Sequence, residues 1–233
     1  MKASAISTIS ATHHQRPRVL LALASTLLIV LIVPNSLVVL FILLPLWWIV
    51  FRPWQLGELY SFAIAAIFFL LQNYVCLKAG IFEFRHKDFM LMPYYEPFLW
   101  GFYFTALKRF IVGTRKSPAF EMKSLIGLLA TSIAFSVFSR TSLFFAATIV
   151  STLFLFVLFH RKLDIAFAVS ALLLGFVVEL FGVYSGLWSY PAPDLLRMPY
   201  WFSTMWISVG LLGWRFLMPL GGWLEQQTTH QGA

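Results

Sequence analysis

Eight apolar stretches, separated by short polar breaks, are the feature that most constrains the fold of this chain. They occupy residues 19–33, 36–51, 59–78, 89–107, 124–139, 142–159, 165–185 and 200–216. A helix needs about 20 apolar residues to cross a bilayer. Hydrophobic residues make up 60% of the chain and charged residues 11%, against about 25% charged residues in a soluble domain. We therefore predict an all-α, polytopic transmembrane helix bundle with about eight spans.

The first two stretches leave an alternative open. The turn-forming residues Pro34, Asn35 and Ser36 separate them, which favours a tight helical hairpin, whereas a single kinked span would reduce the count to seven. The basic N-terminus followed by an apolar run resembles a signal peptide, but apolar sequence continues beyond Pro34, so we expect an uncleaved first span. The expected organisation is a basic cytoplasmic tail (1–18), a transmembrane bundle (19–220) and a C-terminal tail (221–233).

The distribution of positive charge predicts the orientation in the membrane. The chain has a formal net charge of +8, and Lys and Arg collect in the cytoplasmic loops of membrane proteins. With eight spans and both termini in the cytoplasm, most of these residues fall on the cytoplasmic side. We expect an integral protein of a bacterial inner membrane or an equivalent membrane, with no nucleic-acid partner. The sequence does not specify an oligomeric state.

Two acidic residues, Glu96 and Glu179, lie inside apolar stretches rather than at their ends. A charged side chain at the bilayer centre costs roughly 2.5–3.5 kcal/mol on insertion scales, so such residues face the bundle interior and mark functional sites. The predicted topology places both at about 10 Å below the same membrane boundary, at about 1.5 Å rise per residue. Asn73 lies at a comparable depth in a third span. We expect these three residues to converge as catalytic groups, and the alternative is that they only hold helices together.

Prolines and aromatic residues surround the two acids. Pro93 and Pro97 bracket Glu96, and a proline inside a helix kinks it, which predicts a pocket beside Glu96. The expected substrate-binding residues are Tyr94, Tyr95, Trp100, Tyr184, Trp188, Tyr190, Trp201 and Trp206. They could instead form an interfacial aromatic belt, whereas a cavity lined with π faces would stabilise cations. The one sign of an internal repeat is an echo between MPYY at 92–95 and MPYW at 198–201.

The sequence argues against several kinds of catalysis. The five histidines are scattered and none lies in the middle of an apolar stretch, which excludes a His-box di-iron enzyme and disfavours a zinc protease. The single cysteine, Cys76, excludes an internal disulfide and a thiolate metal cluster. There is no G-x-S-x-G, P-loop or G-x-G-x-x-G motif. We expect no metal or cofactor, and a buried, neutral carboxyl group would then serve as a Brønsted acid.

The run ELFGVYSGLWSY at 179–190, followed by Pro199 and Trp206, resembles the acidic and glycine–aromatic signature of membrane carotenoid hydratases of the bisanhydrobacterioruberin hydratase type. That family is similar in turn to the heterodimeric-type lycopene cyclases, in which a proline-preceded glutamate recurs, as in Pro93-x-x-Glu96. The fungal integral-membrane terpene cyclases are a comparable case. The chain departs from the hydratases at Leu187-Trp188-Ser189. The resemblance implies metal-free protonation of an isoprenoid alkene, followed by water capture or ring closure.

Three classes of function follow. The first is an integral membrane enzyme, a cyclase or hydratase of the lyase or isomerase class, acting on a lipophilic isoprenoid, terpenoid or carotenoid substrate. In that enzyme Glu179 or Glu96 would donate the proton, and the other carboxylate or Asn73 would orient water or remove a proton. The second is a small proton- or ion-coupled transporter. The third is a non-catalytic membrane assembly or lipid-binding protein in which the acids stabilise helix packing.

Overall fold

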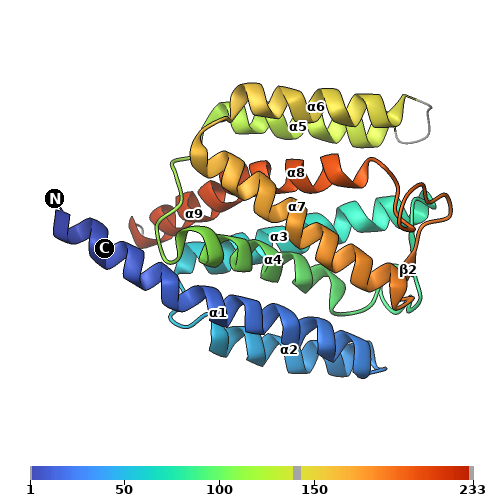
Figure 1. The fold of residues 1–233 in the computed structure, drawn as a ribbon, viewed down its shortest axis with the longest axis horizontal. Coiled ribbons are helices and arrows are strands. Elements are labelled where there is room, and N and C mark those ends of the chain that lie inside the picture. The colour runs from blue at the N-terminus through green and yellow to red at the C-terminus, as the bar shows by residue number, and fades with distance from the viewer. Residues whose placement is uncertain (1, 139–142, 231–233) are drawn as a thin grey trace.

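The computed structural model describes residues 2–138 and 143–230, and these residues form a helical bundle with two short strands (Figure 1). The predicted all-α helix bundle is confirmed. The elements in chain order are α1 (Lys2–Ile32), α2 (Ser36–Val50), α3 (Leu56–Lys78), β1 (Glu83–Phe84), α4 (Glu96–Val112), α5 (Met122–Val137), α6 (Phe144–Leu158), α7 (Lys162–Tyr184), β2 (Trp188–Ser189), α8 (Phe202–Leu212), the π-helical turn η1 (Gly213–Leu217) and α9 (Met218–His230).

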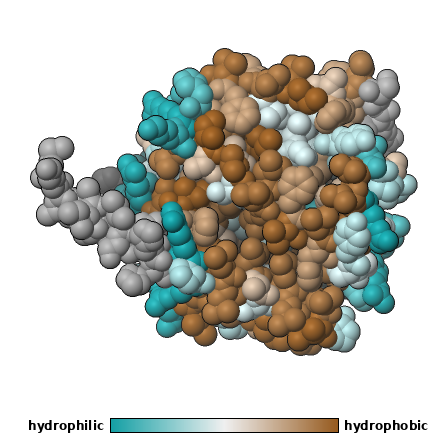
Figure 2. Space-filling view, in the orientation of Figure 1, coloured by the Kyte–Doolittle hydropathy of each residue, from teal (hydrophilic) through white to brown (hydrophobic). Residues whose placement is uncertain are grey.

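The surface of the bundle is that of a protein embedded in a membrane. Figure 2 shows a broad apolar face with polar residues gathered at its two ends. Among the described residues, four helical segments are long and apolar enough to cross a bilayer, namely Gln15–Ile32, Leu56–Lys78, Lys162–Tyr184 and the continuous run Phe202–Thr229. Helices α2, α5 and α6 are shorter but also apolar, and α4 is buried along most of its length. The arrangement agrees with an integral membrane protein of about eight spans.

Helices α1 and α2 form a hairpin rather than one kinked span. Asn35 caps α2, because its side-chain oxygen accepts hydrogen bonds from the backbone N–H groups of Leu37 (3.0 Å) and Val38 (3.1 Å). The two helices then pack together, and the Trp47 indole N–H donates to the Thr26 hydroxyl at 2.9 Å in a buried contact. The Asn35 N-cap therefore marks the start of a second helix, and the first two apolar stretches form two helices rather than one kinked span.

The helices form a central group flanked by two helical hairpins. Helix α3 packs on α4, and α7 packs on α8, as the two most extensive helix pairs of the molecule. The α1–α2 hairpin lies on one side of this group and the α5–α6 hairpin on the other (Figure 1). Each half of the chain thus supplies one hairpin followed by one central helix pair.

The two halves are a tandem repeat. Residues 55–112 match residues 161–218 without a gap at a shift of 106 (186 minus 80 for the paired glycines). This shift superimposes α3 on α7, both of 23 residues, and carries the start of α4 onto the start of α8. Identical residues at paired positions include Gly80/Gly186, Asp88/Asp194, Met92/Met198, Pro93/Pro199, Tyr94/Tyr200, Trp100/Trp206, Arg109/Arg215 and Phe110/Phe216. The echo at 92–95 and 198–201 is thus one part of a longer repeat.

The backbone repeats as well as the sequence. Met90 and Leu91 have φ angles of 48° and 66°, and their counterparts Leu196 and Arg197 have 52° and 64°. Each pair lies at the tip of a tight turn closed by a β-bridge, Phe89 to Met92 or Leu195 to Met198. Positive φ at both central positions is the hallmark of a type I′ turn. The two turns feed directly into α4 and α8 and fix where those helices begin.

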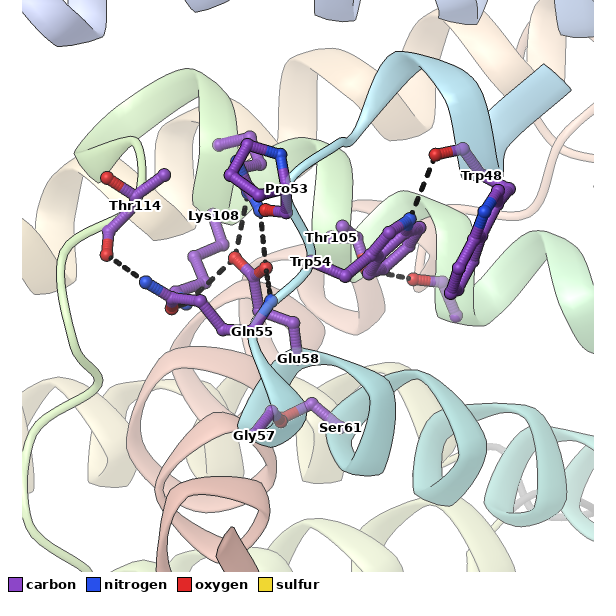
Figure 3. A network of polar contacts seen from close by, with 12 residues as sticks. Trp48, Pro53, Trp54, Gln55, Gly57, Glu58, Ser61, Thr105, Lys108 and Thr114 are labelled. Atoms are coloured by element: carbon purple, nitrogen blue, oxygen red, sulfur yellow. Dashed lines mark hydrogen bonds and ion pairs between the residues drawn. The ribbon is translucent and has the colours of Figure 1, made fainter.

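A buried ion pair is repeated too. Arg109 donates from Nε (2.8 Å) and Nη2 to the Glu58 carboxylate in the first half. Lys108 also donates to Glu58 at 2.9 Å (Figure 3). Arg215 makes the same two-pronged contact with Asp164 in the second half, at 2.6 and 2.8 Å. All four side chains are buried. In the sequence, Glu58 and Asp164 stand immediately before the apolar stretches 59–78 and 165–185, and the fold turns both inward against an arginine.

The two halves meet about a pseudo-twofold axis. Strands β1 and β2 pair antiparallel, with Glu83 opposite its own counterpart Ser189. Deeper in the bundle, the counterparts Trp100 and Trp206 stack with ring centroids 5.3 Å apart and an interplanar angle of 22°. Residues that face one another across such an axis belong to both halves, so a site lying there is built by the repeat as a whole.

The kink predicted at Pro93 and Pro97 is wrong. Helix α4 begins at Glu96, so Pro97 occupies the first turn and Pro93 precedes the helix. Proline is tolerated in the first turn because its missing N–H would have no intrahelical partner there. Glu96 is therefore the first residue of α4 rather than a residue seven positions into a span.

Candidate functional site

A cavity of about 180 Å³ lies in the centre of the bundle, where the two halves meet. Helices α3, α4, α5, α7 and α8 contribute to its wall, together with the segment around β2. The wall is mainly apolar and aromatic, and its polar residues include Glu96, Glu179 and Asn73. An apolar cavity with a few convergent polar groups is the usual form of a site for a small molecule.

Glu96 reaches the cavity from the first position of α4. Its side chain is buried, and its Oε1 accepts a hydrogen bond from Asn73 Nδ2 at 3.2 Å. The position also places the carboxyl group at the positive end of the helix dipole, which favours a negative charge. Asn73 comes from α3, so this contact joins the two central helices of the first half at the cavity.

Glu179 reaches the cavity from α7 and is held by two neutral donors. Its Oε2 accepts hydrogen bonds from the Trp188 indole N–H at 2.8 Å and from the Tyr190 hydroxyl at 2.9 Å. Gly182 makes this possible, because a Cβ atom there would lie 2.0 Å from the Trp188 ring. Gly186, at φ 71°, turns the chain back toward the helix. The chain thus folds back within the run ELFGVYSGLWSY, and two of its side chains donate hydrogen bonds to one acid of the same run.

Two indole groups in the cavity lack a hydrogen-bond partner. The N–H groups of Trp100 and Trp206 lie near Glu96 and Glu179, respectively, yet neither completes a hydrogen bond with any described residue. The hydroxyl of Thr131, from α5, is also unpaired within the described chain, and all three residues line the cavity. Buried polar groups are normally satisfied, so these donors are available to a polar group that enters the cavity.

The cavity opens sideways between α3 and α5. Phe68 of α3 and Ser132 of α5 both line it and both reach the outer surface. The exposed neighbours of Phe68 and Ser132 are apolar, namely Ile67, Leu71, Leu129 and Ile133, so this surface faces lipid in a membrane.

The structure brings most of the predicted site residues together at this cavity. Glu96, Glu179, Asn73, Trp100, Trp188, Tyr190, Trp201 and Trp206 all line it. Three others lie elsewhere: Tyr94 and Tyr184 are exposed, and Tyr95 is buried outside the cavity wall. Tyr94 stacks on Phe89, and Tyr184 lies under the Arg197 guanidinium. The rings of Tyr94 and Tyr184 therefore contact residues at the surface and in the turns rather than the cavity.

The sequence analysis missed several wall residues. Phe69 stacks on Trp100 with ring centroids 3.8 Å apart, and Tyr103 contacts both Trp100 and Trp206. Thr131 was also missed. The helical spacing of Trp100 and Tyr103 was the available signal, because residues three apart share one face of a helix.

Comparison with known proteins reveals a shared fold. No family model and no curated protein matches the chain. Two solved structures of MvINS, a mycobacterial Insig homologue from Mycobacterium vanbaalenii, align with a TM-score of 0.61 and 16% sequence identity. The alignment covers 75% of this chain and 96% of that protein. The fold is that of an Insig homologue. One of the two structures is of a cross-linked trimer.

The resemblance to carotenoid hydratases and lycopene cyclases is wrong, because the matching structures are those of the Insig homologue. The run at 179–190 resembles those enzymes for a physical reason that is unrelated to their reaction. An acid, two glycines and two aromatic residues are what this turn needs to place Trp188 and Tyr190 against Glu179. Such a short pattern reports local packing and does not identify a reaction.

Proposed function

We propose that this protein binds a single lipophilic molecule in the central cavity, and that binding rather than catalysis is its function. The observation that carries the proposal is the pair of unpaired indole N–H groups, on Trp100 and Trp206, at the polar end of an otherwise apolar cavity. A ligand with a polar head group would satisfy these donors. Its apolar tail would then occupy the aromatic part of the cavity and point toward the opening between α3 and α5.

The contacts of Glu179 support a role in binding. Trp188 and Tyr190 both donate hydrogen bonds to one oxygen of its carboxyl group. These contacts hold the carboxyl group in one orientation, as a polar group in the wall of a binding site requires. The main argument for alkene chemistry was the resemblance to carotenoid enzymes, and the matching structures contradict that resemblance.

We infer the environment of the protein from its charge and its surface. The positive charges support an orientation with both termini in the cytoplasm, in a bacterial inner membrane or an equivalent membrane. The lipid that fills the cavity would then come directly from the bilayer, through the opening between α3 and α5. The trimer recorded for the Insig homologue makes a trimer the first assembly to test for this chain.

Lipid retention tests the proposal. Ser132 lies at the mouth of the cavity, so Ser132→Trp should block it, whereas Ile133→Trp places the same bulk on the exposed outer face of α5. Overpacking costs about 1–3 kcal/mol, so we expect the blocked variant to retain about tenfold less ligand. Mass spectrometry of lipids extracted from the purified full chain gives the measurement. Equal retention by both variants, or no retained lipid in the unchanged protein, would contradict the proposal.

A further inference from the structure

A groove on the outside of the bundle lies apart from the central cavity. It has a volume of about 450 Å³, and its wall comes from α2, from the start of α3 and from the turn between them. The residues that line it are all apolar, namely Leu44, Pro45, Trp47, Trp48, Trp54, Leu59 and Phe62, and none of them lines the central cavity. The same two helices expose Phe41, Ile49 and Leu56, so the groove opens toward lipid in a membrane.

Contacts within the protein hold the aromatic wall of the groove in place. The Trp54 indole N–H donates to the Trp48 carbonyl at 3.0 Å, and the two rings stack with centroids 5.8 Å apart (Figure 3). Phe62 packs edge-on against Trp54. Trp47 is buried, and its N–H donates to Thr26. The groove is therefore formed before any ligand binds, and its aromatic surface suits a hydrocarbon chain.

One end of the groove carries a positive charge. The side chain of Arg52 is exposed, and its guanidinium lies 5.8 Å from the centre of the Trp48 ring. Arg52 pairs with no acidic side chain among the described residues. A guanidinium can bind the oxygens of a phosphate group through two parallel hydrogen bonds. The donors of Arg52 are therefore available to an anionic group beside the groove.

Two further cations lie near the same turn. The Gln55 side chain donates to the Thr114 carbonyl at 2.6 Å, and this contact joins the turn after α2 to the loop after α4 (Figure 3). Arg115 and Lys116 follow Thr114 in the chain, and both are exposed. Neither pairs with an acid in the part of the chain that the structure describes. Three exposed cations therefore lie at this end of the groove.

The neighbouring acids do not compensate these three cations. Glu58 is buried and pairs with Lys108 and Arg109. Glu225 of α9 lies 2.9 Å from the position of a Cβ atom on Gly57, and its charge attracts Lys108. Inside this end of the bundle, two acids thus balance two bases. The exposed cations remain in excess, so the surface beside the groove attracts negative charge.

From these observations we propose that the groove binds an anionic phospholipid. One acyl chain lies against the Trp48–Trp54 wall, and the phosphate group binds the guanidinium of Arg52, while Arg115 and Lys116 attract the head group from farther away. Basic pockets beside transmembrane helices bind anionic head groups on the cytoplasmic side of a membrane, and we propose above that this end faces the cytoplasm. The site does not depend on what the central cavity binds.

Competition between two lipids with the same acyl chains tests the proposal. Dioleoyl phosphatidylglycerol and dioleoyl phosphatidylcholine would be added in equal amounts to the purified full chain in a neutral detergent, and native mass spectrometry would count the lipids that stay bound. We expect an excess of the anionic lipid, and we expect high salt to reduce this excess because it screens exposed charges. Equal retention of the two lipids would overturn the proposal.

Charge variants locate the head group. Arg52→Gln should lower the retention of phosphatidylglycerol about fivefold, whereas Arg52→Lys keeps the charge and should keep most of the binding. Lys162→Gln is the matched control, because it removes an exposed cation at the start of α7 that does not line the groove. An equal loss for Arg52→Gln and Lys162→Gln would show a general effect of positive charge and would overturn the proposal.

Bulk variants locate the acyl chain. Leu44→Trp fills part of the groove, whereas Ile49→Trp adds the same bulk on the exposed face of α2. We expect about tenfold lower retention of phosphatidylglycerol for Leu44→Trp and no change for Ile49→Trp. Ser132→Trp, at the mouth of the central cavity, should also leave the excess of the anionic lipid unchanged. Loss of that excess in Ser132→Trp but not in Leu44→Trp would assign the lipid to the central cavity and overturn the proposal.

Discussion

Glu179 shows how single residues determine the geometry of the cavity wall. Its carboxyl group, Trp188 and Tyr190 form one hydrogen-bonded group, and this group depends on a residue with no side chain. Gly182 sits one helical turn below Glu179 on α7 and leaves the space that the Trp188 ring fills. The indole ring of Trp188 can therefore take this position only because residue 182 is glycine.

Gly182→Ala should displace Trp188 and weaken its hydrogen bond to Glu179. The added Cβ would lie 2.0 Å from the ring, and overpacking of this kind costs about 1–3 kcal/mol. We expect a lower thermal midpoint and a shift in tryptophan emission. Gly222→Ala is the matched control, because no atom lies within 4 Å of its Cβ position. Equal stability of the two variants would show that Trp188 can move aside without loss.

At the level of the helices, the buried arginine contacts tie the ends of neighbouring elements together. Arg109 joins the end of α4 to the start of α3, and its Nη2 also donates to the Pro53 carbonyl at 2.8 Å. Arg215 joins η1 to the start of α7. Glu121, just before α5, also contacts Arg215, and a hydrogen bond from Lys123 is the main cause that lowers the pKa of Glu121.

Removal of either arginine should destabilise the bundle strongly. Arg109→Met and Arg215→Met each leave a buried carboxylate without its main partner, which costs about 3–5 kcal/mol. Arg215→Met should be the more harmful, because Glu58 keeps Lys108, whereas Asp164 pairs with no other basic side chain among the described residues. Thermal unfolding in detergent measures the effect. The pair Asp164→Asn with Arg215→Met should recover part of the loss, and no recovery would argue against the ion pair as its cause.

The boundaries of the helices show which features the sequence could predict. Apolar runs placed α3 and α7 within a few residues, because a long stretch without charges has few alternatives in a membrane. Helix α4 was predicted over 89–107 but spans Glu96–Val112. The apolar residues Met90 and Leu91 sit at the tip of a turn with positive φ, and hydropathy carries no information about backbone angles. The two prolines marked a helix start rather than a kink.

The site was predictable in part for the same reason. Glu96, Glu179 and Asn73 stood out because buried polar residues are rare in apolar segments, and all three line the cavity. Tyr94 and Tyr184 were included because aromatic residues near span ends give no sign of their direction. The burial of Glu58 and Asp164 was not predictable, because a linear sequence cannot show that a charged helix end folds inward.

For the molecule as a whole, the tandem repeat is the main finding that the sequence concealed. Its identities fall in the turns and at a few helix positions, such as Trp100/Trp206 and Arg109/Arg215. The intervening lipid-facing positions tolerate any apolar residue, so they diverge without affecting the fold. Only the geometry of the paired turns and ion pairs makes the correspondence clear.

If each half is a folding unit, a cut between the halves should be tolerated. Fragments 1–117 and 118–233, expressed together, should associate through the Trp100–Trp206 stack and the β1–β2 pair. A cut inside the first half, giving 1–85 and 86–233, should reduce the recovery of complex because it separates α3 from α4. Affinity purification through a tag on one fragment measures the recovery. Equal recovery for both cuts would contradict the division into two units.

The pairing of β1 with β2 makes the contact between the two halves independent of the protein concentration. Glu83 lies opposite its own counterpart, Ser189, as residues do at the contact between two identical subunits. Between separate chains, a contact of this kind weakens as the protein is diluted. A covalent connection makes it intramolecular, with an effective concentration set by the linker rather than by the amount of protein. The central cavity of this chain is therefore complete in a single copy, even when the protein is scarce.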